Sequence, residues 1–176
     1  TNSCTKSNPK EQAAENILNR EFNAENINQK WLTDVTEFKY GNEQKAYLSA
    51  ILDLCDKRIV SFVFGHRNNN EIVFKTFDIS VSENTGATPL FHSDRGFQYT
   101  SKMFHQKLID AGMTQSMSRV AKCIDNGPME GFWGILKTEM YYLNKFNTYE
   151  ELKEAVEKYV YYLIYHKLEV HRNGKV

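Results

Sequence analysis

Hydrophobic and polar residues alternate along residues 30–40, KWLTDVTEFKY, which is the pattern of a β-strand with two different faces. One face carries apolar side chains together with a carboxylate, and its members are Leu32, Asp34, Thr36 and Phe38. The opposite face is formed by Trp31, Thr33 and Val35. Residues 45–54 and 58–65 are also rich in β-branched and aromatic residues, and a short polar turn separates them. Three strands joined this closely predict an antiparallel meander.

After the third predicted strand, the spacing of hydrophobic residues changes to one that is typical of helices. In the segment 68–83, asparagines suit the N-cap, and one helical face is formed by Val73, Phe74, Phe77 and Val81. Residues 88–94 form a short apolar strand. Residues 100–112 predict a helix that ends at Gly112, and the residues expected to face inward are Met103, Phe104, Leu108 and Ala111. Residues 113–118 are a candidate fifth strand.

Two more helices are predicted toward the end of the chain. The segment 125–143 has Pro128 in its first turn, where proline is tolerated, and its apolar stripe consists of Met129, Trp133, Leu136 and Met140. The segment 148–163 begins with a Thr148-x-x-Glu151 capping box, and its apolar stripe consists of Leu152, Val156, Tyr159 and Leu163. This order of strands and helices predicts an α/β domain with a mixed sheet.

The chain has 176 residues, of which 41% are hydrophobic, so it is long and apolar enough for one domain with a core. Residues 1–29 are polar and are expected to be a lead-in arm or linker. The body is expected over 30–165, followed by a tail at 166–176. Because no apolar stretch is long enough for a membrane span or a signal peptide, we expect a cytoplasmic protein without a membrane partner.

The net charge and the cysteines limit which kinds of protein this sequence can encode. The 22 basic and 22 acidic residues cancel, which argues against a free-standing basic DNA-binding module but not against an enzyme that acts on nucleic acid. Cys4, Cys55 and Cys123 form no C-x-x-C pair, so a zinc site is not expected. An odd number of cysteines fits a reducing compartment. Cys55 ends an apolar run and is expected to be a core thiol, whereas Cys123 lies in a polar stretch.

Three separated carboxylates are candidates for metal-dependent chemistry. Asp34 lies on the first strand, Asp94 follows the fourth strand, and Glu130 lies on the first turn of a helix. If the first and fourth strands are neighbours, the two aspartates approach each other across the sheet. Mg²⁺ prefers oxygen ligands and takes one or two carboxylates together with substrate phosphate oxygens. Two such ions can hold the attacking and leaving oxygens of a phosphoryl displacement.

The motifs WLTDVTEF, HSDRGFQY and DNGPMEGFWGILKTE resemble the catalytic core of bacterial insertion-sequence transposases of the retroviral-integrase type, the DDE class. Each motif alone is a weak signal. Together, in this order and with 35 residues between Asp94 and Glu130, they are a strong one over roughly residues 30–165. The resemblance implies a ribonuclease H-like fold, with a mixed five-stranded sheet flanked by helices. It also implies that Asp34, Asp94 and Glu130 are the catalytic, metal-binding triad.

The resemblance further implies a reaction and partners. Enzymes of this class use Mg²⁺ or Mn²⁺, here with two ions expected, to cut one DNA strand at the end of the element. The released 3′-hydroxyl then attacks another phosphodiester, so transposon ends and target DNA are the expected partners. A homo-oligomer on DNA is expected. Members of the family usually carry a helix-turn-helix region ahead of the core, which we expect in a missing segment or a partner chain.

Each triad residue also has a structural interpretation. Asp34 could face solvent on its strand, although aspartate is depleted in strands. Asp94 lies in a Ser-Asp-Arg-Gly sequence that suits a turn. Glu130 could stabilise the N-terminus of its helix by its charge.

Four further residues are candidates for supporting roles. His92, Arg95 and Lys137 are candidate DNA contacts. Lys137 lies two helical turns after Glu130 and therefore shares its helix face. The alternatives are a structural histidine, an arginine paired with a carboxylate, and an exposed lysine. Asn126 is expected to cap the helix that carries Glu130 and so to support the site indirectly.

Two other functions compete with a transposase. One is a ribonuclease H-like nuclease without strand transfer, and the other is a non-catalytic DNA-binding remnant. The complete triad argues against a degenerate remnant, and the neutral net charge argues against a pure DNA binder.

Overall fold

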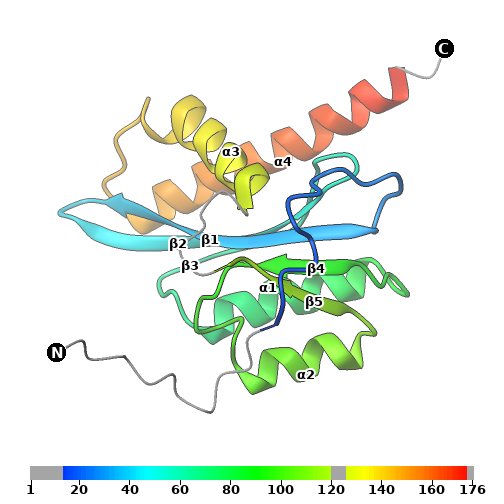
Figure 1. The fold of residues 1–176 in the computed structure, drawn as a ribbon. Coiled ribbons are helices and arrows are strands. Elements are labelled where there is room, and N and C mark those ends of the chain that lie inside the picture. Colours follow the sequence, from blue (N-terminus) through cyan, green and yellow to red (C-terminus); the bar gives the residue numbers. More distant parts are fainter. Residues whose placement is uncertain (1–13, 120–125, 174–176) are drawn as a thin grey trace, which may run out of the picture.

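The computed structural model describes residues 14–119 and 126–173, and these form a five-stranded mixed sheet with helices on both faces (Figure 1). The strands are β1 Lys30–Tyr40, β2 Gln44–Asp53, β3 Ile59–Gly65, β4 Leu90–Ser93 and β5 Thr114–Met117. The α-helices are α1 Asn70–Glu83, α2 Lys102–Asp110, α3 Gly127–Leu136 and α4 Tyr149–Asn173. A π-helix, η2 Lys137–Tyr141, continues directly from α3. The predicted order of elements is confirmed.

The sheet has the strand order β3-β2-β1-β4-β5. Strands β1, β2 and β3 pair antiparallel, as the predicted meander requires, and Asp34 pairs with Ala50 of β2. Strand β4 pairs parallel with β1, and β5 pairs parallel with β4. The first and fourth strands are therefore neighbours, which is the condition that the candidate site needs.

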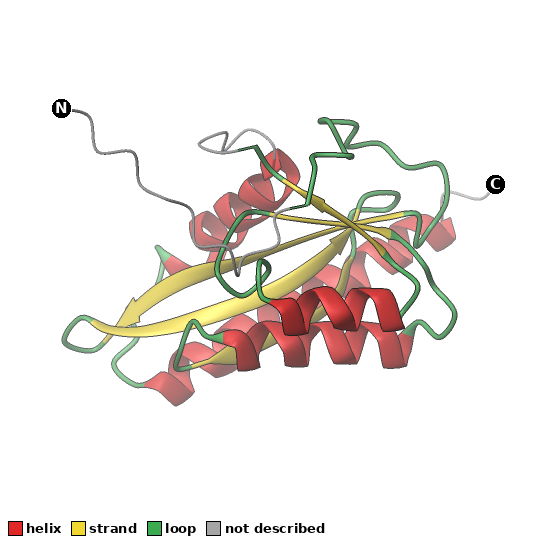
Figure 2. Ribbon diagram, turned by 60° about the horizontal axis from the view of Figure 1, so that its bottom comes forward, coloured by secondary structure: helices red, strands yellow, loops and turns green. Residues whose placement is uncertain are grey.

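Each face of the sheet is covered by its own pair of helices. Helices α1 and α2 lie on one face, and Figure 2 brings this layer forward. Helices α3 and α4 lie on the other face (Figure 1). Consecutive residues of β1 enter the two cores, because Trp31 packs in the α1/α2 core and Leu32 packs in the α3/α4 core. The alternation predicted for this strand is confirmed, and it puts Asp34 on the side of α3.

The ends of α1 and α2 follow the predicted capping chemistry, and the start of α4 follows it with one difference. The side chain of Asn69 accepts a hydrogen bond from the Ile72 N–H at 3.3 Å, and Gly112 ends α2 with a positive φ of 70°. Thr148 accepts from the Glu151 N–H at 3.2 Å, but the Glu151 carboxylate accepts from the N–H of Asn147, one residue before the expected partner.

Two predictions about burial are wrong. Met103 was expected to face inward but is 66% exposed, because the short helix α2 turns only Phe104 and Leu108, four residues apart, into the core. Cys55 is half-buried in the turn after β2 and is not a core thiol. Cys4 and Cys123 lie outside the described residues.

The described part of the N-terminal arm packs against the sheet. Leu18 is buried in the α3/α4 core, and the N–H groups of Ile17 and Leu18 both donate to the Ser116 hydroxyl at 3.0 Å. These bonds tie the arm to β5. Among the helices that the structure describes, none is long and apolar enough to cross a membrane.

Candidate active site

Asp34 lies on β1, and Asp94 follows the end of the neighbouring strand β4. The parallel register pairs Leu32 of β1 with His92 of β4, and the pairing of the two strands ends there. Asp34 and Asp94 each lie two residues beyond this last pair. Neighbouring strands are about 4.8 Å apart, so the predicted approach of the two aspartates across the sheet agrees with this topology.

Asp34 is a half-buried carboxylate with a raised pKa. The pKa of Asp34 is raised from 3.8 to about 6, chiefly by burial, and the hydrogen bond from Trp133 opposes that rise. The negative charge of Asp94, and more weakly that of Glu130, contributes to the raised pKa. Asp94 and Glu130 are therefore both within electrostatic reach of Asp34.

Asp94 forms the turn that its sequence predicts. Its Oδ1 accepts a hydrogen bond from the Gly96 N–H at 2.8 Å, as in an Asx turn. A Cβ atom at residue 96 would lie 3.0 Å from this same oxygen, which explains the glycine there. A carboxylate has about four lone-pair sites, so the turn and a ligand role are compatible for Asp94.

Glu130 lies on the exposed first turn of α3, and Asn126 holds the start of that helix against β1. The Asn126 side chain makes no capping bond, so the expected capping role is wrong. Its Nδ2 instead donates to the carbonyl of Thr33 at 3.5 Å, and its buried Oδ1 has no partner among the described residues. Because Thr33 precedes Asp34, this contact links the helix of Glu130 to the strand of Asp34.

The charges of Asp94 and Glu130 act on Asp34, but the three carboxylates do not close around a common point. In the part of the chain that the structure describes, no three His, Cys, Asp or Glu side chains converge closely enough to hold a metal ion. The donor set still suits Mg²⁺, which prefers hard oxygen ligands. A divalent cation would also neutralise the charge repulsion that helps to raise the pKa of Asp34.

Trp133 is the residue that sequence reasoning placed only in the core. It is 7% exposed, and its indole Nε1 donates to Asp34 Oδ2 at 3.0 Å. This bond orients one carboxylate oxygen and stabilises the charged form. A signal was available, because a buried tryptophan N–H usually needs an acceptor and Trp133 lies on the same helix as Glu130.

Tyr99 is a second buried group beneath the site. Its hydroxyl lies 3.3 Å from the Thr33 hydroxyl, which donates to the Ala50 carbonyl at 3.0 Å. Burial raises the pKa of Tyr99 well above its usual value, and the charge of Asp34 adds to this effect. The Tyr99 hydroxyl therefore stays protonated, and its contact with Thr33 supports β1 next to Asp34.

Lys137 lies near the carboxylates at the junction of α3 and η2. Its Nζ is 5.2 Å from the centre of the Phe38 ring, a cation–π arrangement. Burial lowers the pKa of Lys137, whereas the charges of Glu37 and Asp34 raise it. A positive charge thus lies beside the site on the α3 face of β1.

His92 and Arg95 differ in their access to solvent. His92 is 0% exposed and its ring nitrogens lie 2.8 Å from the Ser116 hydroxyl and 3.2 Å from the Ser118 hydroxyl. A side chain this buried cannot contact DNA directly, so its proposed DNA contact is corrected to a structural role between β4 and β5. Arg95 is exposed, and its Nε donates to the Ser118 carbonyl at 2.7 Å.

Two family models match the chain, and both are described as integrase core domain. The first covers residues 24–123, and the second covers residues 130–170. Asp34 and Asp94 lie in the first segment, and Glu130 is the first residue of the second.

Curated relatives include proteins of insertion sequences. The chain is 39% identical over 156 residues to a Haemophilus influenzae protein described as transposase-like and uncharacterized, with 89% of this chain and 72% of the relative covered. It is 40% identical over 152 residues to Escherichia coli InsK, which is assigned as the transposase of insertion sequence element IS150. That match covers 86% of this chain and 53% of InsK, so the chain spans about half the length of this relative.

Solved structures with the same fold come from retroviruses. A chain of a simian T-cell lymphotropic virus intasome in complex with a PP2A regulatory subunit aligns with a TM-score of 0.67 and 19% identity, covering 89% of this chain and 54% of that one. The HTLV-2 integrase catalytic core domain in complex with magnesium aligns with a TM-score of 0.59 and 22% identity, covering 77% and 85%. At these identities the likeness concerns the fold, and it confirms the predicted ribonuclease H-like architecture.

Proposed function

This chain belongs to the integrase core domain family of insertion-sequence transposases, and we propose that it is the catalytic domain of a polynucleotidyl transferase. It would cut one DNA strand at the end of an insertion sequence and join the new 3′ end to target DNA. The observation that supports this proposal is the parallel pairing of β1 and β4, which ends two residues before Asp34 and Asp94. Glu130 on the first turn of α3 completes the acidic set.

The three carboxylates would hold two divalent ions, Mg²⁺ or Mn²⁺. Asp34 and Asp94 would share one ion, and Asp34 and Glu130 would hold the other, with Glu130 as the looser ligand because it is exposed. When bound, such ions supply Lewis-acid activation of water and of the phosphodiester. The magnesium in the HTLV-2 integrase core structure supports this assignment.

The protein groups around the carboxylates would orient them for this role. Trp133 fixes Oδ2 of Asp34, and the Asp94–Gly96 turn fixes Oδ1 of Asp94. Asn126 keeps the start of α3, and with it Glu130, next to β1. Arg95 and Lys137 would contact DNA phosphates, since each places a positive charge at this end of the sheet.

The proposed partners are transposon ends and target DNA, bound by a homo-oligomer in the cytoplasm. The name of InsK supports the first part, and the HTLV-2 integrase core was solved in dimeric and trimeric forms, which supports the second. A helix-turn-helix region for recognising the element ends would reside in a further segment or in a partner chain.

The test is a paired assay of strand cleavage and strand joining with Mg²⁺ on DNA duplexes. The proposal expects both activities in the unmodified chain and neither in Asp34→Asn, Asp94→Asn or Glu130→Gln. Asp110→Asn, an exposed acid on α2, is the matched control and should retain both. Cleavage without joining would support the nuclease alternative, and normal cleavage by a triad variant would remove that residue from the active site.

A further inference from the structure

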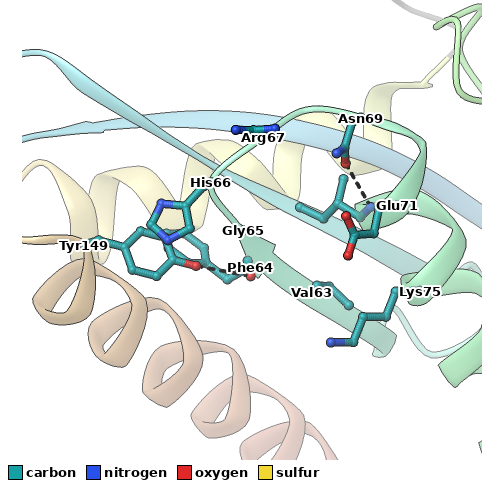
Figure 3. A pocket seen from close by; sticks show the side chains of 10 residues that line it. Val63, Phe64, Gly65, His66, Arg67, Asn69, Glu71, Lys75 and Tyr149 are labelled. Carbon is teal, nitrogen blue, oxygen red and sulfur yellow. Dashed lines mark hydrogen bonds between the residues drawn. The ribbon is translucent and has the colours of Figure 1, made fainter.

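A pocket of about 390 Å³ lies where β3 ends, between the first turns of α1 and α4 (Figure 3). We call it the His66 pocket. The residues that matter for its chemistry are His66, Arg67, Glu71, Lys75 and Tyr149. Its volume is in the range of small-molecule sites, and none of the roles assigned above uses it.

The pocket contains a stacked pair of aromatic rings. The rings of His66 and Tyr149 have centroids 3.6 Å apart and an angle of 19° between their planes. Tyr149 is held from behind, because its ring packs 5.3 Å from that of Phe64 and its hydroxyl donates to the Phe64 carbonyl at 3.5 Å. His66 is exposed and lies on this fixed ring (Figure 3), so one face of the imidazole remains open for stacking.

The pocket also carries an excess of positive charge. Arg67 and Lys75 are both exposed, and neither forms an ion pair with any residue within 14–119 or 126–166. Glu71 is the single acid among the lining residues that the structure describes. Two cations beside an open aromatic face are the combination that binds single-stranded nucleic acid, through phosphate contacts and base stacking.

The loop that forms the pocket is joined to the loop of Asp94. Asn68, next to Arg67, accepts a short hydrogen bond from the side chain of Gln98. Gln98 follows Asp94 by four residues and is buried. The loop at residues 66–69 is therefore connected directly to the segment that follows Asp94.

We infer that the His66 pocket holds one unpaired nucleotide of the DNA strand that extends from the active site. Its base stacks on His66, and Arg67 and Lys75 contact the flanking phosphates. The nucleotide must be unpaired, because a base within a duplex is already stacked on both faces. This inference rests on the proposed function, since it takes DNA as the substrate.

The test compares two single strands of equal length, about 12 nucleotides, one of oligothymidylate and one fully abasic. Both carry the same phosphates, but only the first offers bases. The unmodified chain should bind oligothymidylate more tightly, and His66→Ala should lose at least about fivefold of that preference. His66→Phe should keep it. Arg67→Ala and Lys75→Ala should weaken the binding of both strands equally. Lys158 is an exposed lysine on α4 outside the pocket, and Lys158→Ala should change the affinity for neither strand.

Fluorescence anisotropy of labelled strands measures each affinity, and strand cleavage is followed in parallel. Equal binding of both strands by the unmodified chain, or an unchanged preference in His66→Ala, overturns the nucleotide subsite. If either of these outcomes occurs while the unmodified chain cleaves DNA and Asp34→Asn does not, the subsite fails and the proposed function stands. If the unmodified chain neither binds nor cleaves DNA, the proposed function itself fails.

Discussion

The protein contains two tryptophan–aspartate pairs on opposite sides of the sheet, and they differ in one respect. Trp31 donates its indole N–H to Asp53 at 3.2 Å, and Asp53 also accepts from the N–H groups of Asn28 and Cys55 at 2.7 and 2.8 Å. Trp133 donates to Asp34 at 3.0 Å, but Asp34 faces two further carboxylates and has a pKa raised to about 6. Asp53 thus accepts three hydrogen bonds from the protein, whereas the charge of Asp34 is destabilised by burial and by neighbouring negative charges.

We propose that this difference separates a structural acid, Asp53, from a candidate catalytic acid, Asp34. A buried carboxylate that receives several N–H bonds is stabilised by the fold. A buried carboxylate beside other acids costs folding free energy, and that cost is relieved when a cation binds. The comparison can be tested at each of the two pairs.

The largest difference is expected between Asp34→Asn and Asp53→Asn. Asp34→Asn should reduce metal-dependent cleavage at least about a thousandfold, because metal ions supply several kcal/mol of transition-state stabilisation. Asp53→Asn should leave cleavage per folded molecule unchanged but lower the free energy of unfolding by about 2–3 kcal/mol, since hydrogen bonds to a buried charge are lost. Cleavage assays and denaturant titrations measure the two effects, and a loss of cleavage in folded Asp53→Asn would remove the distinction.

The second prediction concerns the pH dependence of stability. Between pH 3.8 and about 6 the folded state retains the Asp34 proton that the unfolded chain has released, so the free energy of unfolding falls as pH rises through this window. The amide introduced by Asp34→Asn cannot deprotonate, so the free energy of unfolding of this variant does not fall in this window. Above pH 6 the variant should therefore be more stable than the unmodified protein by about 2–3 kcal/mol.

The measurement is the free energy of unfolding from denaturant titrations at several pH values. Asp110→Asn on the surface of α2 is the control and should follow the unmodified protein. If Asp34→Asn is not stabilised above pH 6, the raised pKa of Asp34 is contradicted.

The third prediction contrasts the two tryptophans. Trp133→Phe keeps most of the ring packing but removes the N–H, so the affinity for Mn²⁺ should fall about 10–100-fold, as for other groups that orient a metal ligand. Trp31→Phe should reduce stability and leave Mn²⁺ affinity unchanged. Calorimetric titration with Mn²⁺ measures both variants, and equal affinities in Trp133→Phe and the unmodified protein would show that the indole does not position Asp34.

The smallest effect is expected at Lys137. Lys137→Ala should weaken DNA binding modestly and reduce the slope of log K against log salt concentration by about 1, as for one lost phosphate contact. Lys102→Ala, on the α1/α2 side, is the control. Binding measured at several salt concentrations decides this, and an unchanged slope would place Lys137 away from the phosphates.

Several features of the fold were predictable because they depend on neighbours along the chain. The alternation of β1, the N-cap at Asn69 and the stop at Gly112 follow from local periodicity and backbone conformation. Met103 was mispredicted for the converse reason. Its helix is short, and the surface against which it packs decides which of its faces is buried.

Sequence motifs proposed the members of the candidate site, but they could not predict the contacts around those members. The motifs identify Asp34, Asp94 and Glu130, but they do not show that His92 is buried beneath them. They also do not show that Asn126 bonds to the β1 backbone instead of capping its own helix. Each of these contacts joins residues that are far apart in sequence, so no local pattern contains it.

The sequence by itself determined the types and order of the elements, the face of β1 that carries Asp34, and the family to which the chain belongs. Only the tertiary structure decided that β1 and β4 are adjacent, that Trp133 is the partner of Asp34, and that His66 stacks on Tyr149 in a pocket lined by Arg67 and Lys75. Periodicity and capping are local and can be read along the chain. Desolvation, charge interaction and ring stacking depend on distances in space, which arise only when the helices pack on the sheet.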